Sequence, residues 1–150
     1  TYSGYSALCM SSGMTEEGCL YTFEINDEQE DFTRPWLENA PYAPRIEMIV
    51  GDVFELLPAM NLHFDMVFID ANKRQYADYY ELVMRFLNPG GYILADNTLW
   101  DGHVVEPEYE NDAQTQGIRR FNRLVAADPR VENVILPLRD GLTVIRHKGI

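Results

Sequence analysis

Residues 64–70 read Phe-Asp-Met-Val-Phe-Ile-Asp, and the fold can be predicted outward from this segment. The nearly continuous apolar run is typical of a strand buried on both faces, as the strands of parallel sheets are. Between residues 76 and 87, apolar side chains recur at the spacing of one face of an amphipathic helix. Asn88-Pro89-Gly90-Gly91 is expected to end this helix, and residues 92–95 form a second buried strand. Two buried strands joined by a helix predict a parallel α/β sheet.

The same alternation continues through the rest of the chain. The elements expected before residue 64 are a helix ending near Ser12-Gly13, a strand over 19–24, a helix over about 27–38 that contains Pro35, a strand over 45–50 and a short helix over 53–60. After residue 96 we expect a polar loop over 101–112, a helix ended by Asp128-Pro129, and two strands over 131–136 and 142–147 joined as a hairpin. We predict one α/β domain over residues 1–150, with a doubly wound, mostly parallel sheet, helices on both faces and a C-terminal antiparallel hairpin.

Composition excludes several classes of protein. Apolar residues make up 46% and charged residues 24% of the 150 residues, which argues against a disordered or fibrous chain. Twelve Lys and Arg against 24 Asp and Glu give a net charge of −12, which disfavours nucleic acid and anionic membranes as partners. Cys9 and Cys19 provide neither a disulfide framework nor a zinc site, and the apolar runs are far shorter than the roughly 18 to 20 residues of a membrane span. We therefore expect a cytoplasmic protein without a membrane segment.

The first residues, Thr1-Tyr2-Ser3-Gly4-Tyr5-Ser6, form a glycine-containing turn that leads into a helix. Such a turn normally follows a strand and opens a helix whose amino end faces a ligand. Because no residue is left to form that strand, we expect that the first strand is missing and that the chain is a fragment or a processed form.

Polar side chains at two expected strand ends form a candidate metal site. Asp70 ends one strand, and Asp96-Asn97 ends the next one. Ligands of open α/β sheets bind at the carboxyl ends of strands, and carboxylate and amide oxygens suit magnesium, manganese or calcium rather than zinc or copper. The alternative is structural: Asp70 would cap the following helix, and Asp96-Asn97 would form only a turn. The two features together favour the metal site.

Lys73 lies three residues after Asp70 and is a candidate general base. Burial and a nearby cation both disfavour the ammonium form of a lysine. The alternative is a solvated surface charge at the start of a helix.

Other residues have weaker patterns, each with a structural alternative. Glu24 follows Gly4 by the 20 residues at which an acid holds the ribose in nucleotide-binding folds, but it could also only precede a helix. Gly51-Asp52-Val53 could frame a planar base or form a simple turn. Trp100 could line an aromatic substrate or pack in the core. The cluster of Arg119, Arg120 and Arg123 is interpreted as a solvated helix face.

These motifs together resemble the cation-dependent O-methyltransferases, a family that includes catechol and caffeoyl-CoA O-methyltransferases and bacterial relatives. The segments that carry the resemblance are Thr1-Tyr2-Ser3-Gly4-Tyr5-Ser6, Phe23-Glu24-Ile25-Asn26, Val67-Phe68-Ile69-Asp70-Ala71-Asn72-Lys73, Pro89-Gly90-Gly91-Tyr92, Asp96-Asn97-Thr98-Leu99-Trp100 and Asp140-Gly141-Leu142-Thr143. The resemblance runs nearly from end to end, although the family's Glu-x-Gly before the first turn is absent. It implies a Rossmann-like class I methyltransferase fold and a homodimer.

By this resemblance the cofactors are S-adenosylmethionine and a divalent cation, with magnesium the first choice and manganese or calcium alternatives. The resemblance implies that the cofactor lies against Gly4, Ser6, Glu24, Asp52, Val53 and Asp70. Ser6 would lie beside its amino-acid portion, Glu24 would hold its ribose, and Asp52 and Val53 would flank its adenine. Asp70, Asp96 and Asn97 would hold the cation, and Lys73, with Asp70, would be catalytic.

The resemblance, taken together with these residues, implies one leading function and two alternatives. The first is methylation of a small hydroxylated aromatic substrate, a catechol-like compound or another vicinal diol, in which the cation stabilises the substrate oxygen. The second is methylation of 5-hydroxyuridine in tRNA, which the net charge disfavours. The third is a non-catalytic nucleotide-binding remnant, against which the intact Asp70, Lys73, Asp96 and Asn97 argue.

Overall fold

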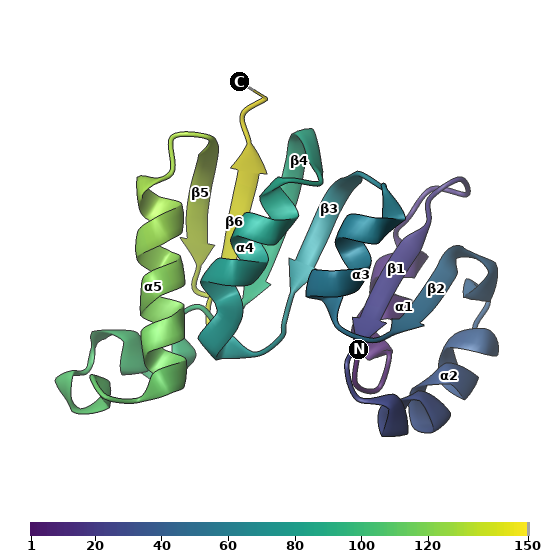
Figure 1. Ribbon diagram of the computed structural model, residues 1–150, viewed down its shortest axis with the longest axis horizontal. Helices are drawn as coiled ribbons and strands as arrows, with labels where there is room; N and C mark the ends of the chain where they lie inside the picture. Colours follow the sequence, from purple (N-terminus) through teal and green to yellow (C-terminus); the bar gives the residue numbers. More distant parts are fainter. Residues whose placement is uncertain (150) are drawn as a thin grey trace. The chain divides into compact units, whose positions relative to one another are not determined.

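A computed structural model describes residues 1–149, which form two compact units (Figure 1). The first unit is Thr1–Asn61, and the second begins at Leu62. Each unit contains its own hydrogen-bonded strands and its own helices. No helix in residues 1–149 is both long enough and apolar enough to cross a membrane.

The first unit is a parallel strand pair covered by helices. Its elements are α1 (Tyr5–Ser12), β1 (Leu20–Glu24), a 3-10 turn at Asp27–Gln29, α2 (Glu30–Glu38), a 3-10 turn at Ala43–Arg45, β2 (Ile46–Val50) and α3 (Val53–Met60). The strands pair in parallel from Leu20 opposite Ile46 to Glu24 opposite Val50. Pro35 lies inside α2 and does not end it. The predicted boundaries are therefore confirmed within a few residues.

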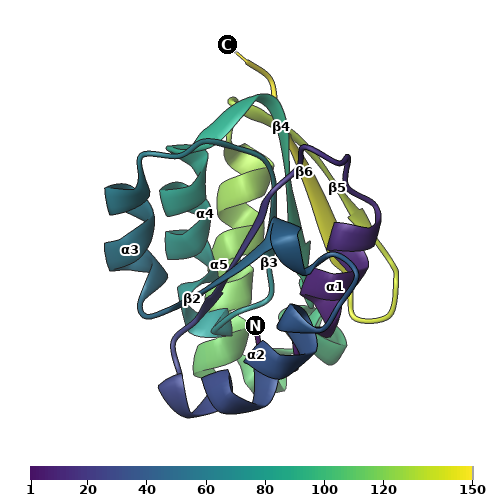
Figure 2. The same ribbon diagram turned by 90° about the vertical axis from the view of Figure 1, so that its right-hand side faces the viewer.

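A small apolar core joins the helices of the first unit to its strands. Ala7 of α1, Leu37 of α2 and Met48 of β2 are buried together. Figure 2 shows α1 and α2 on one side of the strand pair and α3 on the other. Both cysteines of this unit, Cys9 and Cys19, are free and exposed.

The second unit has four strands in the order β3-β4-β6-β5. Its elements are β3 (Phe64–Ile69), a 3-10 turn at Lys73–Gln75, α4 (Tyr76–Met84), β4 (Leu87–Asp96), 3-10 turns at Trp100–Val105 and Pro107–Tyr109, α5 (Ala113–Ala127), β5 (Val131–Leu136) and β6 (Leu142–His147). β3 and β4 pair in parallel, whereas β6 pairs antiparallel with both β4 and β5. The predicted α/β class, parallel strand pairing and C-terminal hairpin are confirmed.

The predicted end of the helix before β4 is wrong. α4 ends at Met84, and Asn88-Pro89-Gly90-Gly91 lies within β4. The pairing of β3 with β4 shifts here, because Phe64 lies opposite Leu87 but Met66 lies opposite Tyr92. A bulge of this kind accommodates Pro89 and the positive φ of 82° at Gly90 within a strand.

The expected burial of β3 on both faces is also wrong for part of the strand. Met66 is 48% exposed, and within residues 1–149 β3 is an edge strand of the four-stranded sheet. An edge strand has a sheet neighbour on one side only, so fewer side chains cover it. Ile69, at the end of the strand, is 4% exposed.

The core of the second unit lies between its sheet and the helices α4 and α5, which cover the same face of that sheet (Figure 2). Tyr76, Tyr80 and Phe121 are completely buried there. The Phe121 ring meets both tyrosine rings edge-on, at centroid distances of 5.5 Å to Tyr76 and 6.0 Å to Tyr80. Such pairs add about 0.5–1.5 kcal/mol beyond the burial of their area. α4 and α5 are therefore fixed to each other through one aromatic cluster.

Candidate active site

The ends of β3 and β4 bring the predicted metal-site residues to one edge of the sheet. Ile69 pairs with Ala95, so the next residues, Asp70 and Asp96, follow on neighbouring parallel strands. Neighbouring strands lie about 4.8 Å apart. The Asp70 side chain is 46% exposed, and Asp96 Oδ1 accepts the backbone N–H of Asn97 at 2.7 Å. The structure therefore places Asp70, Asp96 and Asn97 together at this edge.

The backbone turn at Asn97 is held from two sides. Asn97 has a positive φ of 59°, a conformation that asparagine tolerates better than most residues. The next residue, Thr98, donates its backbone N–H to Gly141 O at 3.0 Å, and its carbonyl accepts Asn122 Nδ2 at 2.8 Å. Thr143 Oγ1 lies 2.8 Å from Thr98 Oγ1 in the buried interior. The β5–β6 hairpin and α5 thus fix the turn that carries Asp96 and Asn97.

Lys73 is buried rather than solvated, with 9% of the residue exposed. Its Nζ donates to Asp70 Oδ1 at 2.8 Å and to the hydroxyl of Tyr76 at 2.6 Å. The alternative role of Asp70 as a helix cap is not observed, because Asn72 caps this turn through its side chain, which accepts the Arg74 N–H at 3.2 Å. Lys73 and Asp70 therefore form an ion pair at the strand ends.

Tyr76 belongs to this site although its sequence pattern indicates only a core position. Its hydroxyl accepts a hydrogen bond from Lys73 Nζ and donates one to Asp96 O at 2.9 Å. Ile69 O, at 3.3 Å from the hydroxyl, is a weaker second acceptor. Burial, together with the charges of Asp70 and Asp96, raises the pKa of Tyr76 above its ordinary value, so the hydroxyl keeps its proton. The sequence signal for a role of Tyr76 at the site is its position three residues after Lys73.

The residues at this edge fit a hard cation. Within residues 1–149, no group of three or more His, Cys, Asp or Glu side chains is placed to hold a metal ion. The predicted ligand set contains only two carboxylates, those of Asp70 and Asp96, and its third oxygen belongs to the Asn97 amide. Such an all-oxygen set suits magnesium, manganese or calcium, and it leaves coordination positions for substrate oxygens and water.

Five of the six predicted cofactor residues lie in the first unit, around α1 and the ends of β1 and β2, and the sixth, Asp70, follows β3 in the second unit. Glu24 ends β1 opposite Val50, and its carboxylate accepts the backbone N–H groups of Tyr2 at 2.9 Å and Asn26 at 3.1 Å. Burial acts to raise the pKa of Glu24, but these two backbone hydrogen bonds hold the pKa below its ordinary value. Glu24 is thus an ionised acceptor bonded directly to the turn before α1.

Gly4 and Ser6 lie at the amino end of α1, next to that turn. Gly4 caps the helix with a φ of 78°, and a Cβ there would lie 2.8 Å from Leu37 Cδ2, so the position requires glycine. Ser6 is exposed in the first turn of the helix. Backbone N–H groups at a helix amino end favour anionic groups.

Asp52 and Val53 follow β2. Asp52 caps α3, because its side chain accepts the Phe54 N–H at 2.9 Å, and Val53 is the first residue of that helix. Asp52 therefore has the structural role that a simple turn predicts. A role of Asp52 or Val53 at an adenine ring remains a prediction.

Trp100 is partly buried and packs against the core of the second unit, and a role at an aromatic substrate remains a prediction. The interpretation of the arginine cluster as a solvated face is wrong for Arg119, which donates to the carbonyls of His103, Val104 and Glu106 at 2.8–3.0 Å. Arg120 is exposed and pairs with Asp78 at 3.3 Å.

Comparisons with known proteins agree with these features. Residues 1–148 match the family described as O-methyltransferase. The chain is 35% identical over 160 residues to caffeoyl-CoA O-methyltransferase 1 of Zea mays, covering 97% of this chain and 61% of the maize protein. The chain thus spans less than two thirds of that relative's length.

Solved structures show the same fold. An O-methyltransferase from Bacillus cereus in complex with SAH superposes with a TM-score of 0.91 at 32% identity, covering 99% of this chain and 71% of that one. The O-methyltransferase TomG from Streptomyces achromogenes, in complex with SAM, gives a TM-score of 0.90 at 29% identity, covering 99% of this chain and 70% of that one. These neighbours confirm the Rossmann-like methyltransferase fold.

Proposed function

Because the chain belongs to the O-methyltransferase family, we propose that it moves a methyl group from S-adenosylmethionine to a hydroxyl of a catechol-like compound or another vicinal diol, with the help of a divalent cation. The observation that carries this proposal is the buried Lys73 amine, 2.8 Å from Asp70 Oδ1, beside the paired ends of β3 and β4. A base beside oxygen ligands for a cation is the arrangement that removal of a hydroxyl proton requires.

The first unit supplies five of the six proposed cofactor residues, and Asp70 of the second unit is the sixth. Glu24, ionised at neutral pH, accepts hydrogen bonds and so suits the ribose hydroxyls. Gly4 and Ser6 would bind the amino-acid portion at the amino end of α1, and Asp52 and Val53 would flank the adenine. The cofactors in the Bacillus cereus and Streptomyces achromogenes structures, SAH and SAM, support this choice of cofactor.

The second unit supplies the proposed chemistry. Asp70, Asp96 and Asn97 would hold the cation, which when bound would stabilise negative charge on the acceptor oxygen. Lys73 in its amine form would take the hydroxyl proton, and S-adenosylmethionine, when bound, would supply its sulfonium methyl group to the acceptor oxygen. The products are the methyl ether and neutral S-adenosylhomocysteine, with the proton on Lys73. The role of these residues is to hold the reacting oxygen and its proton acceptor in place.

The test is methyl transfer to 3,4-dihydroxybenzoate from labelled S-adenosylmethionine. We expect methylated product with magnesium, loss of product on adding a chelator, and recovery when excess magnesium is restored. Asp70→Asn should lower the turnover number by at least about 100-fold. Asp65→Asn is a matched control, because Asp65 lies near the other end of β3, where its carboxylate accepts a hydrogen bond from Asn88 Nδ2 at 2.8 Å. Transfer that is insensitive to the chelator, or equal losses in both variants, would contradict the proposal.

The tRNA alternative has less support. RNA binding would need a positive surface, but the net charge is −12 and Arg119 is used inside the second unit. The Lys73–Asp70 ion pair argues against a non-catalytic remnant, because a site that had lost its activity would not need to keep a buried lysine beside a carboxylate. A homodimer, which the resemblance implies, and a cytoplasmic location, which the sequence composition implies, remain predictions.

A further inference from the structure

We propose that Tyr76 is a positioning residue for Lys73: its buried hydroxyl holds the lysine amine at the ends of β3 and β4. The proposal rests on the proposed function, in which Lys73 is the general base. It adds a residue that would act through Lys73 and not by touching the substrate.

The Tyr76 hydroxyl connects the amine to the backbone of the sheet. It accepts from Lys73 Nζ at 2.6 Å and donates to Asp96 O at 2.9 Å. The other hydrogen bond of the amine is to Asp70 Oδ1 at 2.8 Å, on a side chain that is 46% exposed. Nζ also lies 4.7 Å from the centre of the Tyr76 ring, a contact that a phenylalanine would retain. Without the hydroxyl, the amine would keep the exposed Asp70 as its hydrogen-bond partner, so Tyr76 supplies the buried one of the two hydrogen bonds described for Lys73.

The position of the hydroxyl is itself fixed by the core. The Tyr76 ring has no exposed surface and meets Phe121 edge-on, with ring planes at 83°. The backbone of Lys73 is fixed independently, because a Cβ at Gly117 of α5 would collide with the Lys73 carbonyl oxygen. Both the backbone and the amine of Lys73 are thus fixed by the interior of the second unit.

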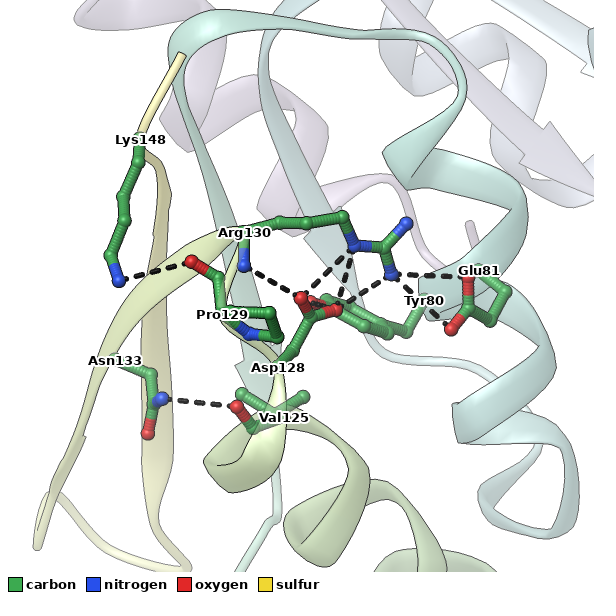
Figure 3. A network of polar contacts seen from close by, with 8 residues as sticks. All are labelled: Tyr80, Glu81, Val125, Asp128, Pro129, Arg130, Asn133 and Lys148. Carbon is green, nitrogen blue, oxygen red and sulfur yellow. Dashed lines mark hydrogen bonds and ion pairs between the residues drawn. The ribbon is translucent and has the colours of Figure 1, made fainter. Parts of the chain in front are cut away.

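Tyr80 provides a matched control on the same helix. It lies one turn after Tyr76, is equally buried and meets the same Phe121 ring at 6.0 Å. Its hydroxyl, however, donates to Asp128 Oδ2 at 2.8 Å, in a separate network (Figure 3). Tyr76→Phe and Tyr80→Phe each remove one buried hydroxyl from α4, but only the first removes a contact of Lys73.

The first experiment compares the kinetics of the two variants. We expect Tyr76→Phe to lower kcat by about tenfold or more, while KM for S-adenosylmethionine and for the catechol acceptor stays within about twofold. Tyr80→Phe should keep kcat within about twofold of the wild type, since it leaves Lys73 untouched. Equal kcat values for the two variants, or an effect of Tyr76→Phe on KM alone, would overturn the proposal.

The second experiment does not depend on activity. The chain has two lysines, Lys73 and Lys148, so carbon-13 labelling of lysine gives two resolvable Cε signals for relaxation measurements. Lys148 is an internal reference, because its exposed amine makes one hydrogen bond, to Pro129 O at 3.1 Å (Figure 3). Lys73 should be more ordered than Lys148 in the wild type and in Tyr80→Phe, and should approach the mobility of Lys148 in Tyr76→Phe.

The two experiments separate the two proposals. If the wild type transfers no methyl group but Tyr76→Phe still mobilises Lys73, the proposed function fails and the positioning role stands. If the wild type is active and Tyr76→Phe changes neither kcat nor the mobility of Lys73, the positioning role fails. If Tyr76→Phe does not fold, the relaxation measurement on the wild type tests the proposal by itself. A Lys73 side chain as mobile as that of Lys148 would contradict the proposal, and a more ordered one would support it.

Discussion

Asp128, just after α5, shows how polar contacts fix single side chains in this protein. It accepts the Tyr80 hydroxyl at 2.8 Å and the Arg130 guanidinium, which in turn reaches Glu81 at 3.2 Å (Figure 3). The Arg130 side chain, which donates directly to it, lowers the pKa of Asp128 to about 2 against the opposing effect of burial. Asp128 thus connects α4 to the start of β5.

This contact predicts a pH-dependent stability. A carboxyl group whose pKa is lowered by folding stabilises the native state above its unfolded pKa, about 3.9, and loses that contribution as the pH falls towards 2. Asp128→Asn should therefore lower the free energy of unfolding by on the order of 1–2 kcal/mol at pH 7, discounted for the half-exposed Arg130. Urea unfolding at pH 7 and pH 2.5 measures the difference, which should shrink at the lower pH.

The control for this prediction is an exposed ion pair of the same unit. Glu132 lies 3.6 Å from Arg146, and both side chains are more than half exposed. Glu132→Gln should change the unfolding free energy by less than about 1 kcal/mol at either pH. An Asp128→Asn effect that is the same at both pH values would show that the contact does not act through the charge of the carboxylate.

Among the elements, α5 organises the site without contributing a ligand to it. Gly117 lies against the backbone of Lys73 and Arg74, Asn122 binds the carbonyl of Thr98, and Arg119 binds three carbonyls of residues 103–106. The helix therefore contacts the segments that follow both β3 and β4. The sequence predicts α5 only as an amphipathic helix. It does not show why residue 117 is a glycine, because the reason is the close approach of the Lys73 and Arg74 backbone.

Gly117→Ala should damage both stability and activity. The added Cβ would collide with the Lys73 carbonyl, and this overpacking should cost about 1–3 kcal/mol of unfolding free energy. It should also lower kcat, because Lys73 must move. Gly13→Ala is the control, since a Cβ there would meet only Met10 O at an ordinary 3.7 Å. Chemical unfolding and methyl-transfer kinetics test both, and an unchanged kcat in Gly117→Ala would show that Lys73 tolerates the shift.

Arg119→Ala should loosen residues 100–110. Loss of the three hydrogen bonds to carbonyls should cost about 1–3 kcal/mol, as expected for bonds from a charged donor. Limited proteolysis should then cut this segment sooner than in the wild type. Arg120→Ala removes only an exposed pair with Asp78 and should leave the cutting rate unchanged. Equal rates for the two variants would contradict the assigned role of Arg119.

At the scale of the whole molecule, the excess of acidic residues should weaken the folded state at low ionic strength. A net charge of −12 on 150 residues gives self-repulsion that salt screens. The thermal midpoint should therefore rise when sodium chloride is increased from about 20 to about 200 mM, over which the screening length falls to below about 10 Å. A midpoint that falls over this range would mean that the ion pairs contribute more than the repulsion.

Helices and strands could be predicted from the sequence where burial determines the spacing of the apolar residues. The apolar run of residues 64–69 and the strand ends at Glu24 and Asp96 appear as predicted, because they depend on local periodicity. The prediction for residues 88–91 is wrong because proline and glycine usually indicate a turn, whereas here they fill a bulge in β4. The role of Tyr76 cannot be predicted, because an aromatic residue in an apolar stripe does not reveal which groups its hydroxyl will meet.

The Phe121 ring joins two otherwise separate networks. Phe121 packs against Tyr76, whose hydroxyl accepts a hydrogen bond from Lys73, and against Tyr80, whose hydroxyl donates one to Asp128. A replacement at this position would disturb the hydrogen bonds of Lys73 and the Asp128 network together, so substitutions of the two tyrosines are coupled through one ring. Natural variation should accordingly be narrow at Phe121, although its side chain is completely buried.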